Sequence, residues 1–126
     1  MEGRERVLGP DHPDTLGSVH NLGNLLRDKG DNEGAEKLYR RALEGQEKQL
    51  GPDHPSTLIS VNNLGILLRD KGDYEGAEKL FRRALAGRKN ALGAEHQDTR
   101  NSAQQLRNLL GKRGDVNSGL LMIFDM

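Results

Sequence analysis

Apolar and small side chains recur every three or four positions along the chain, which is the spacing of one face of an α-helix. The first such stripe runs through Leu16, Val19, Leu22, Gly23 and Leu26. A second stripe runs through Ala35, Leu38, Tyr39, Ala42 and Leu43. No run alternates apolar and polar residues with the period of a β-strand, and β-branched residues are few. The pattern predicts an all-α protein built of antiparallel helix pairs.

Residues that start and stop helices flank these stripes. Pro13 suits the first turn of a helix, and Asp14 is predicted to cap the exposed amides of that turn. Ser56 takes the capping place in the next unit. Gly30 and Gly72 follow the last apolar positions of their stripes, where a residue in the left-handed conformation is expected to end the helix.

The second stripe is flanked by acidic and basic residues four positions apart, and each such pair stabilises a helix by about 0.2–0.5 kcal/mol. The pairs are Glu33/Lys37, Glu36/Arg40 and Glu44/Lys48. Arg40–Arg41 and Arg82–Arg83 are predicted to lie on the same solvated surface. Glycines at positions 17, 34, 45, 76 and 87 fall inside predicted helices and cost about 0.5–1 kcal/mol each relative to alanine. We therefore expect low stability.

The chain repeats itself. Residues 8–49 align with residues 50–91 without a gap, and about 31 of the 42 aligned positions are identical, which is the signature of a solenoid. A weaker third copy, degenerate or truncated, occupies residues 92–126. Residues 1–7 align with residues 43–49, so they are predicted to be the remnant of a preceding second helix. We expect one repeat array over residues 1–126.

The composition excludes several classes of function. Nineteen basic and nineteen acidic residues among 126 cancel, so the chain has no basic surplus for nucleic acid. Cysteine is absent, which removes disulfides and thiolate sites and fits a reducing compartment. The longest apolar run, Leu120–Phe124, is far shorter than the roughly 20 residues that span a bilayer. We expect no nucleic-acid or membrane partner and a cytoplasmic location.

Small and large apolar residues follow a fixed order within each unit. In the second copy they are Val61, Leu64, Gly65, Leu68, Gly72, Tyr74, Ala77, Phe81 and Ala84. This order resembles the tetratricopeptide repeat, whose usual period is about 34 residues. The period here is 42, with the connector Leu-Gly-Pro-Asp-His-Pro, and that combination is similar to the repeats of kinesin light chains.

The resemblance implies a right-handed α-solenoid of antiparallel helix pairs, with two full repeats and a partial one at each end. In such a unit, Gly23 and Gly65 allow the two helices to approach closely. Tyr39 and Phe81 supply most of the packing mass. Arg107 stands at the close-packing glycine position of the third copy, so we expect its helix pair to pack less well.

The resemblance also implies that the first helix of each unit lines a concave groove that binds peptides. The predicted groove residues are His20, Asn21, Asn24 and Arg27 in the first copy, Ile59, Asn62, Asn63, Ile66 and Arg69 in the second, and Asn101, Gln104 and Asn108 in the third, with Gly17, Asp28, Asp70 and Lys112 facing or rimming it. Asparagine can bond both main-chain groups of an extended peptide, arginine can bind a carboxylate, and the isoleucines offer an apolar strip. In a second interpretation, each arginine only pairs with the aspartate that follows it.

Three histidines invite the idea of a metal site. His12, His54 and His96 recur at the repeat period beside acidic residues. Zinc needs three or four ligands at one point, and successive repeats hold these side chains apart. We expect each histidine to shape its own connector by local hydrogen bonds. Serines and carboxylates also occupy repeated positions without a unique partner, so we predict no catalytic, cofactor or metal site.

These observations predict a protein-interaction module rather than an enzyme. By its resemblance to kinesin light chains, the chain is expected to act as an adaptor or scaffold for a protein or a short peptide, extended or acidic. It would be associated with the cytoskeleton if it is part of a motor complex. The alternative is a structural repeat segment of a larger signalling or sensor protein, with no ligand of its own. The apolar run Leu120–Phe124 also predicts self-association.

Overall fold

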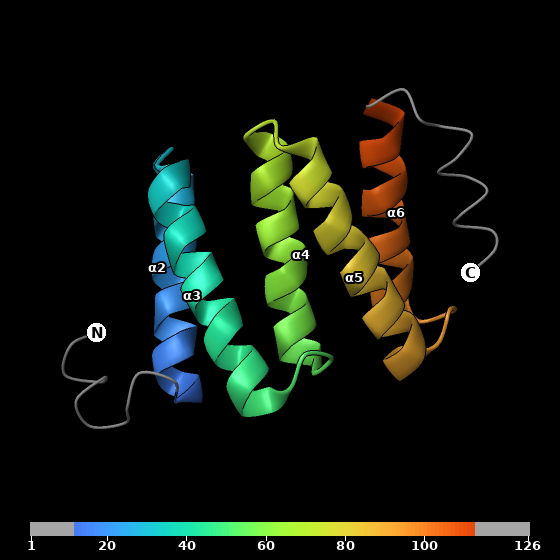
Figure 1. Ribbon diagram of the computed structural model, residues 1–126, viewed down its shortest axis with the longest axis horizontal. Helices are drawn as coiled ribbons and strands as arrows, with labels where there is room; N and C mark the ends of the chain where they lie inside the picture. Colours follow the sequence, from blue (N-terminus) through green and yellow to red (C-terminus); the bar gives the residue numbers. More distant parts are fainter. Residues whose placement is uncertain (1–11, 113–126) are drawn as a thin grey trace.

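The computed structural model describes residues 12–112, and this part of the chain folds into five helices without a strand. They are α2 (Pro13–Asp28), α3 (Asn32–Leu50), α4 (Pro55–Asp70), α5 (Tyr74–Leu92) and α6 (Gln97–Lys112). Each helix packs against the next one along the chain. Figure 1 shows α2, α4 and α6 side by side, with α3 and α5 inclined across them. The predicted α-solenoid of antiparallel helix pairs is confirmed.

The cap of the first helix in each full unit lies two residues earlier than expected. The prediction that Asp14 and Ser56 cap these helices is wrong, because the caps are His12 and His54. In each case the histidine Nδ1 accepts a hydrogen bond of 3.1 Å from the backbone N–H two residues later. Proline at the first helical position disfavours helical backbone in the residue before it, and that residue becomes the extended cap.

The turn between the two helices of a unit is closed at both ends by one aspartate. Gly30 adopts the expected left-handed conformation with φ of +88°. The backbone N–H of Asp31 then bonds the carbonyl of Leu26 at 2.8 Å, as in a Schellman motif. The carboxylate of Asp31 accepts from the N–H of Gly34 at 2.9 Å and caps the next helix. Asp73 repeats both roles in the second unit.

The core of each unit is an aromatic ring against a glycine. Tyr39 and Phe81 are fully buried. A Cβ atom added to Gly23 would lie 2.8 Å from a ring carbon of Tyr39, and one added to Gly65 would lie 2.8 Å from Phe81. Real Cβ contacts are not this short, so glycine is required at both places. The predicted close approach is confirmed.

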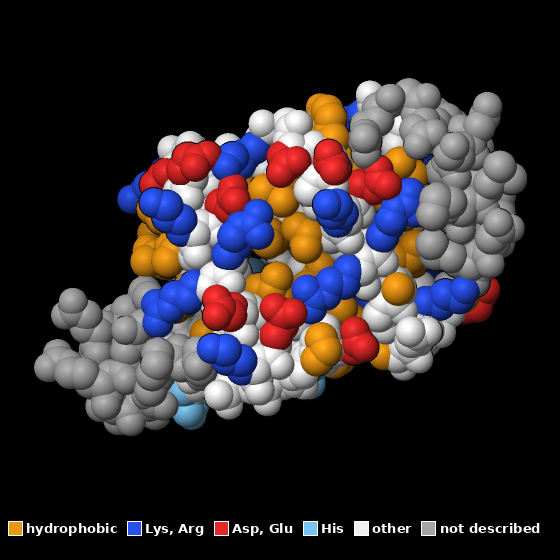
Figure 2. Space-filling model, in the orientation of Figure 1, with side chains coloured by type: hydrophobic (Ala, Val, Ile, Leu, Met, Phe, Trp, Pro, Cys, Tyr) orange, Lys and Arg blue, Asp and Glu red, His pale blue; other side chains and the backbone are white. Residues whose placement is uncertain are grey.

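Two of the three expected ion pairs within α3 form, and the third is replaced by a bond between units. Arg40 lies 2.8 Å from Glu36, and Lys48 lies 3.7 Å from Glu44. Glu33 instead pairs with Lys71 of the next unit at 2.5 Å. Figure 2 shows acidic and basic side chains intermixed over this face of the stack.

Further polar contacts also join the two units. Lys71 donates to Glu36 as well, at 2.6 Å, and this bond is the main reason that the pKa of Glu36 lies below its ordinary value. Arg83 reaches Glu47 of α3 at 2.9 Å. Arg83 was expected on the solvated surface, and it is instead half-buried because neighbouring units stack closely enough for its side chain to cross the joint.

Candidate binding surface

A cleft of about 230 Å³ opens where the first helices of the two full units lie next to each other. Its lining consists of Gly17, His20 and Asn21 from α2, Gln46 from α3, and Ser56, Ile59 and Ser60 from α4. Three predicted groove residues, His20, Asn21 and Ile59, therefore come together here. Ile59 is 50% exposed although it is apolar, so its side chain is available to a partner.

The side chain of His20 lines this cleft and contacts residues of both units. Its Nε2 atom lies 3.1 Å from the Asn63 side-chain amide of α4. Its ring stacks on Tyr39 with a centroid distance of 5.0 Å. Burial, and secondly the positive charge of Arg27, lower the pKa of His20 below its ordinary value. The neutral ring therefore serves as a fixed wall of the cleft.

Two predicted groove residues contribute to the packing of the core instead. Asn24 accepts a hydrogen bond from the hydroxyl of Tyr39. Ile66, at the corresponding place in the second unit, packs against the core cluster that contains Phe81. A polar side chain in one unit thus corresponds to an apolar side chain in the other. Both residues complete the packing of their unit, which makes them less available to a peptide than Ile59.

The arginines differ in how firmly they are held. Arg69 donates to Gln105 of α6 at 2.9 Å and lies 3.4 Å from Asp70. The second interpretation, pairing with the following aspartate, thus describes part of its environment. Arg27 is partly exposed and forms no ion pair within residues 12–112. The side-chain oxygen of Asn62, in α4, is buried without a hydrogen-bond partner.

The predicted residues of the third unit do not share the cleft. Asn101 is exposed and accepts from Gln97 at 2.9 Å. Asn108 accepts from Gln104 at 2.8 Å. Gln104 itself lines a different cavity, between α5 and α6. The cleft is therefore formed by the first two units.

Sequence reasoning missed the residues at the joint between units. The hydroxyl of Ser60 donates to the side chain of Gln46. At the same place in the next joint, Arg88 donates to Ser102 at 2.9 Å and to the Asp98 carbonyl at 3.2 Å. The serines recur with the repeat period, but their partners differ between copies, so the repeat pattern alone did not reveal these contacts.

The histidines of the connectors form local hydrogen bonds, as expected. Nδ1 of His12, His54 and His96 each accepts from a backbone N–H at 3.1 Å. Within the described residues, no three potential ligands gather into a group that could hold a metal ion. None of the helices described is long and apolar enough to cross a membrane.

A known protein family and several solved structures share this arrangement of helices. A family model described as tetratricopeptide repeat matches residues 1–44, 14–90 and 60–117. The crystal structure of a candidate kinesin light chain with nearly identical TPR-like repeats, from Podosopora anserina, superposes with a TM-score of 0.85 at 25% identity. The match covers 94% of this chain and 56% of that one.

A second solved structure shows the same fold. BtubC (BKLC) from P. vanneervenii superposes with a TM-score of 0.84 at 23% identity, and the match covers 93% of this chain and 47% of that one. The chain thus spans about half the length of these solved proteins. No protein of curated function matches the sequence.

Proposed function

The chain belongs to the tetratricopeptide repeat family, whose repeats are in general non-catalytic scaffolds for protein interaction, and we propose that it binds an extended peptide segment of a partner protein along α2 and α4. The groove would continue toward the exposed Asn101 of α6. The observation that carries the proposal is the cleft between the two first helices, with a half-exposed isoleucine on its wall.

The chemistry of the cleft suits a peptide main chain with one apolar anchor. Ile59 supports the proposal because an aliphatic side chain of the peptide that packs against it would be removed from water, which favours binding. Asn21 is exposed, and its amide can donate to a carbonyl and accept from an N–H. Arg27 and Arg69 lie toward the other end of these helices, where they would favour a carboxylate on the partner.

The differences between the two full copies support the same surface. Among the residues of the first helix, the copies differ only at 14/56, 17/59, 20/62 and 24/66. Positions 17, 20, 56 and 59 line the cleft, whereas the cleft residues Asn21 and Ser60 are the same in both copies. Scaffold positions repeat because each unit has the same packing to satisfy. Four of the six cleft positions on the first helices vary, which is expected of a surface that contacts different parts of one ligand.

A peptide selection against the full chain tests this function. We expect the selected peptides to bind at least about tenfold more weakly, or about 1.4 kcal/mol, to Ile59→Ala, Asn62→Ala and Arg69→Ala. Leu92→Ala removes an exposed apolar side chain at the end of α5 and serves as the matched control, with unchanged affinity. Unchanged affinity of all three groove variants would refute the groove.

The resemblance to kinesin light chains supports an adaptor role in the cytoplasm, in a motor complex if the parent protein contains one. A selection that yields no peptide at all would instead favour the structural repeat segment without a ligand. The expected self-association rests on Leu120–Phe124, which lies outside the described residues.

A further inference from the structure

The cleft between α2 and α4 is open at a position that carries no side chain. Gly17 is one of its lining residues, and a Cβ atom added there would meet nothing within 4 Å. The residue 42 positions later is Ile59, whose side chain is 50% exposed on the α4 side of the same cleft. The first helix of one unit thus leaves out the side chain that the first helix of the next unit presents.

The walls of this cleft are uncharged and held in place. Among the described residues that line it there is no Asp, Glu, Lys or Arg. The hydroxyl of Ser60 donates to Gln46. The ring of His20 stacks on Tyr39, and its Nε2 atom lies 3.1 Å from the Asn63 amide. Walls that are fixed before the ligand arrives reduce the entropy lost on binding, and a charged ligand group would find no opposite charge here.

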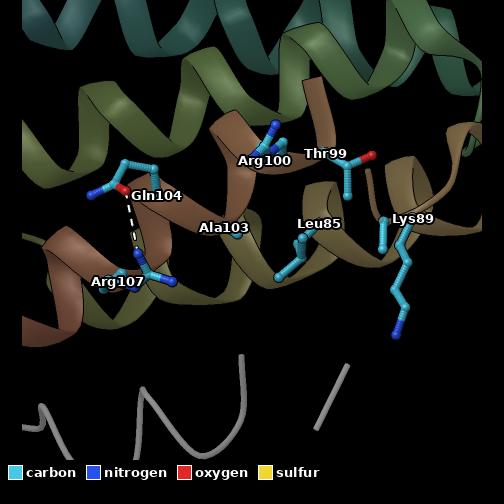
Figure 3. A pocket seen from close by; sticks show the side chains of 8 residues that line it. Leu85, Lys89, Thr99, Arg100, Ala103, Gln104 and Arg107 are labelled. Atoms are coloured by element: carbon cyan, nitrogen blue, oxygen red, sulfur yellow. Dashed lines mark hydrogen bonds between the residues drawn. The ribbon is translucent and has the colours of Figure 1, made fainter. Parts of the chain in front are cut away.

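The cavity between α5 and α6 differs in character. Its volume is about 350 Å³, and its lining includes Lys89, Arg100 and Arg107. Figure 3 shows the side chains of Lys89 and Arg107 at opposite ends of the lining. An uncharged, apolar ligand group is therefore better matched by the cleft between α2 and α4.

The joint between the second and third units does not repeat the chemistry of the cleft. Forty-two positions after each lining residue, Ile59 stands for Gly17, Arg88 for Gln46, and Asn101 for Ile59. Arg88 is only 8% exposed and brings a positive charge into this joint. The combination of a missing side chain and an exposed apolar one belongs to the first joint, so a peptide across the groove has one preferred place for an apolar residue.

The volume of the cleft suits a single side chain. It measures about 230 Å³, whereas pockets for drug-sized molecules measure about 300–1,000 Å³. An apolar cavity of about 150 Å³ already holds a benzene molecule. The cleft therefore has room for one side chain of the size of leucine, methionine or phenylalanine.

We propose that Gly17 is a specificity-determining residue of the peptide groove, because the space beside it receives one large, uncharged apolar side chain of the bound peptide. This anchor side chain packs against Ile59, and the contact removes apolar surface of both partners from water. The inference rests on the proposed function, since it requires a peptide that lies along α2 and α4.

Substitutions on both partners test this role of Gly17. Each apolar residue of a peptide selected against the full chain is replaced in turn by alanine, and binding is measured to the parent and to Gly17→Ile. On the parent, alanine at the anchor should weaken binding at least about tenfold. On Gly17→Ile the new side chain fills the cleft, so the selected peptide should bind at least about tenfold more weakly, and alanine at the anchor should cause no further loss.

A matched control separates the cleft from a general effect of the substitution. Gly17→Ile should fold, because α4 carries isoleucine at the same place of the repeat. Gly111 is a helical glycine of α6 where an added Cβ also meets nothing within 4 Å, and it lines neither cavity. Gly111→Ile should therefore bind the selected peptide as the parent does.

The results that would overturn this inference differ from those that would refute the groove. Unchanged affinity in Gly17→Ile, together with weaker binding to Asn62→Ala or Arg69→Ala, would place the anchor elsewhere in the groove. An equal loss from alanine at the anchor on parent and Gly17→Ile would do the same. Selected peptides that share no apolar residue would exclude an apolar anchor. Unchanged affinity of every groove variant would refute the groove itself, and this role of Gly17 with it.

Discussion

Helices α2 and α6 stand at the two ends of the described stack, and their outward faces differ. On α2, Leu22 and Leu25 are 36% and 48% exposed. Their counterparts in α4, which packs between α3 and α5, are Leu64 and Leu67, and both are fully buried. On α6 the corresponding leucines are again buried, and Arg100 and Arg107 line a cavity between α5 and α6.

The comparison separates two reasons for an exposed face in a solenoid. On α2 the exposed residues are the same leucines that α4 buries. The described part of the chain contains no helix before α2 that would cover them. On α6 the residues themselves have changed, because Arg100 and Arg107 stand where α4 has Leu58 and Gly65. In an array whose units contact only their neighbours, the residues of an exposed face therefore show whether it resembles an interior face or differs from one.

The largest effect is expected from the same substitution at matched positions of α4 and α2. Leu67→Ala opens a cavity in the interior and should lower the free energy of unfolding by about 2–5 kcal/mol. Leu25→Ala, 42 residues earlier, should lower it by less than about 1 kcal/mol because that side chain is half exposed. Denaturant unfolding of both variants measures the difference, and equal losses would contradict the assignment of α2 to the edge.

A smaller effect separates Gly65 of α4 from Arg107 at the corresponding position of α6. The Cβ atom introduced by Gly65→Ala would lie 2.8 Å from the buried ring of Phe81, so we expect a loss of about 1–3 kcal/mol from overpacking. Arg107→Ala at the corresponding position should stay within about 0.5 kcal/mol of the parent. If Gly65→Ala were neutral in the same unfolding experiment, the close helix contact would be disproved.

A stabilising change sharpens the comparison at α2. Gly17 is helical, and a Cβ there would meet nothing within 4 Å. Gly17→Ala should therefore raise the free energy of unfolding by about 0.5–1 kcal/mol, since alanine favours helix. Gly30→Ala is the matched control and should destabilise, because its φ of +88° disfavours a side chain. A loss of stability in Gly17→Ala would contradict the open space seen on α2.

The smallest effect is a pH dependence confined to α2, since the counterparts of His20 are Asn62 and Gln104. Burial and the charge of Arg27 lower the pKa of His20 in the folded state, so the unfolded chain takes up the proton first as the pH falls. Stability is then complete above about pH 6.5 and decreases below it. Unfolding at several pH values should show a shallower decrease for His20→Gln than for the parent. Identical slopes would exclude this contribution.

Much of the scaffold could be predicted because its determinants are local and repeated. The apolar stripe, the left-handed Gly30 and the Gly65–Phe81 contact all follow from periodicity within one unit. The cap at His12 was missed because the proline after it takes the first helical position, which leaves the residue before it as the cap. The bond from Lys71 to Glu33 was missed because it depends on how closely two units stack.

The candidate site was predictable only in part for a geometric reason. A first helix contacts its own second helix on one side and the groove on another, and several predicted residues lie on the border between these faces. Ile59 falls on the groove side. Asn24 bonds Tyr39 of the second helix, Ile66 packs against the core cluster, and Gln104 lines the cavity between α5 and α6. Spacing along the sequence cannot separate such neighbouring directions.

The most direct test of the central claim is a titration of isotope-labelled chain with a selected peptide, followed by NMR. The account predicts that the amide signals of Gly17, Asn21 and Ile59 shift together, because one peptide lies across α2 and α4. Signals of Lys37 and Lys79 on the outer helices should stay in place. Shifts confined to the outer helices, or to one unit alone, would contradict a groove shared by neighbouring repeats.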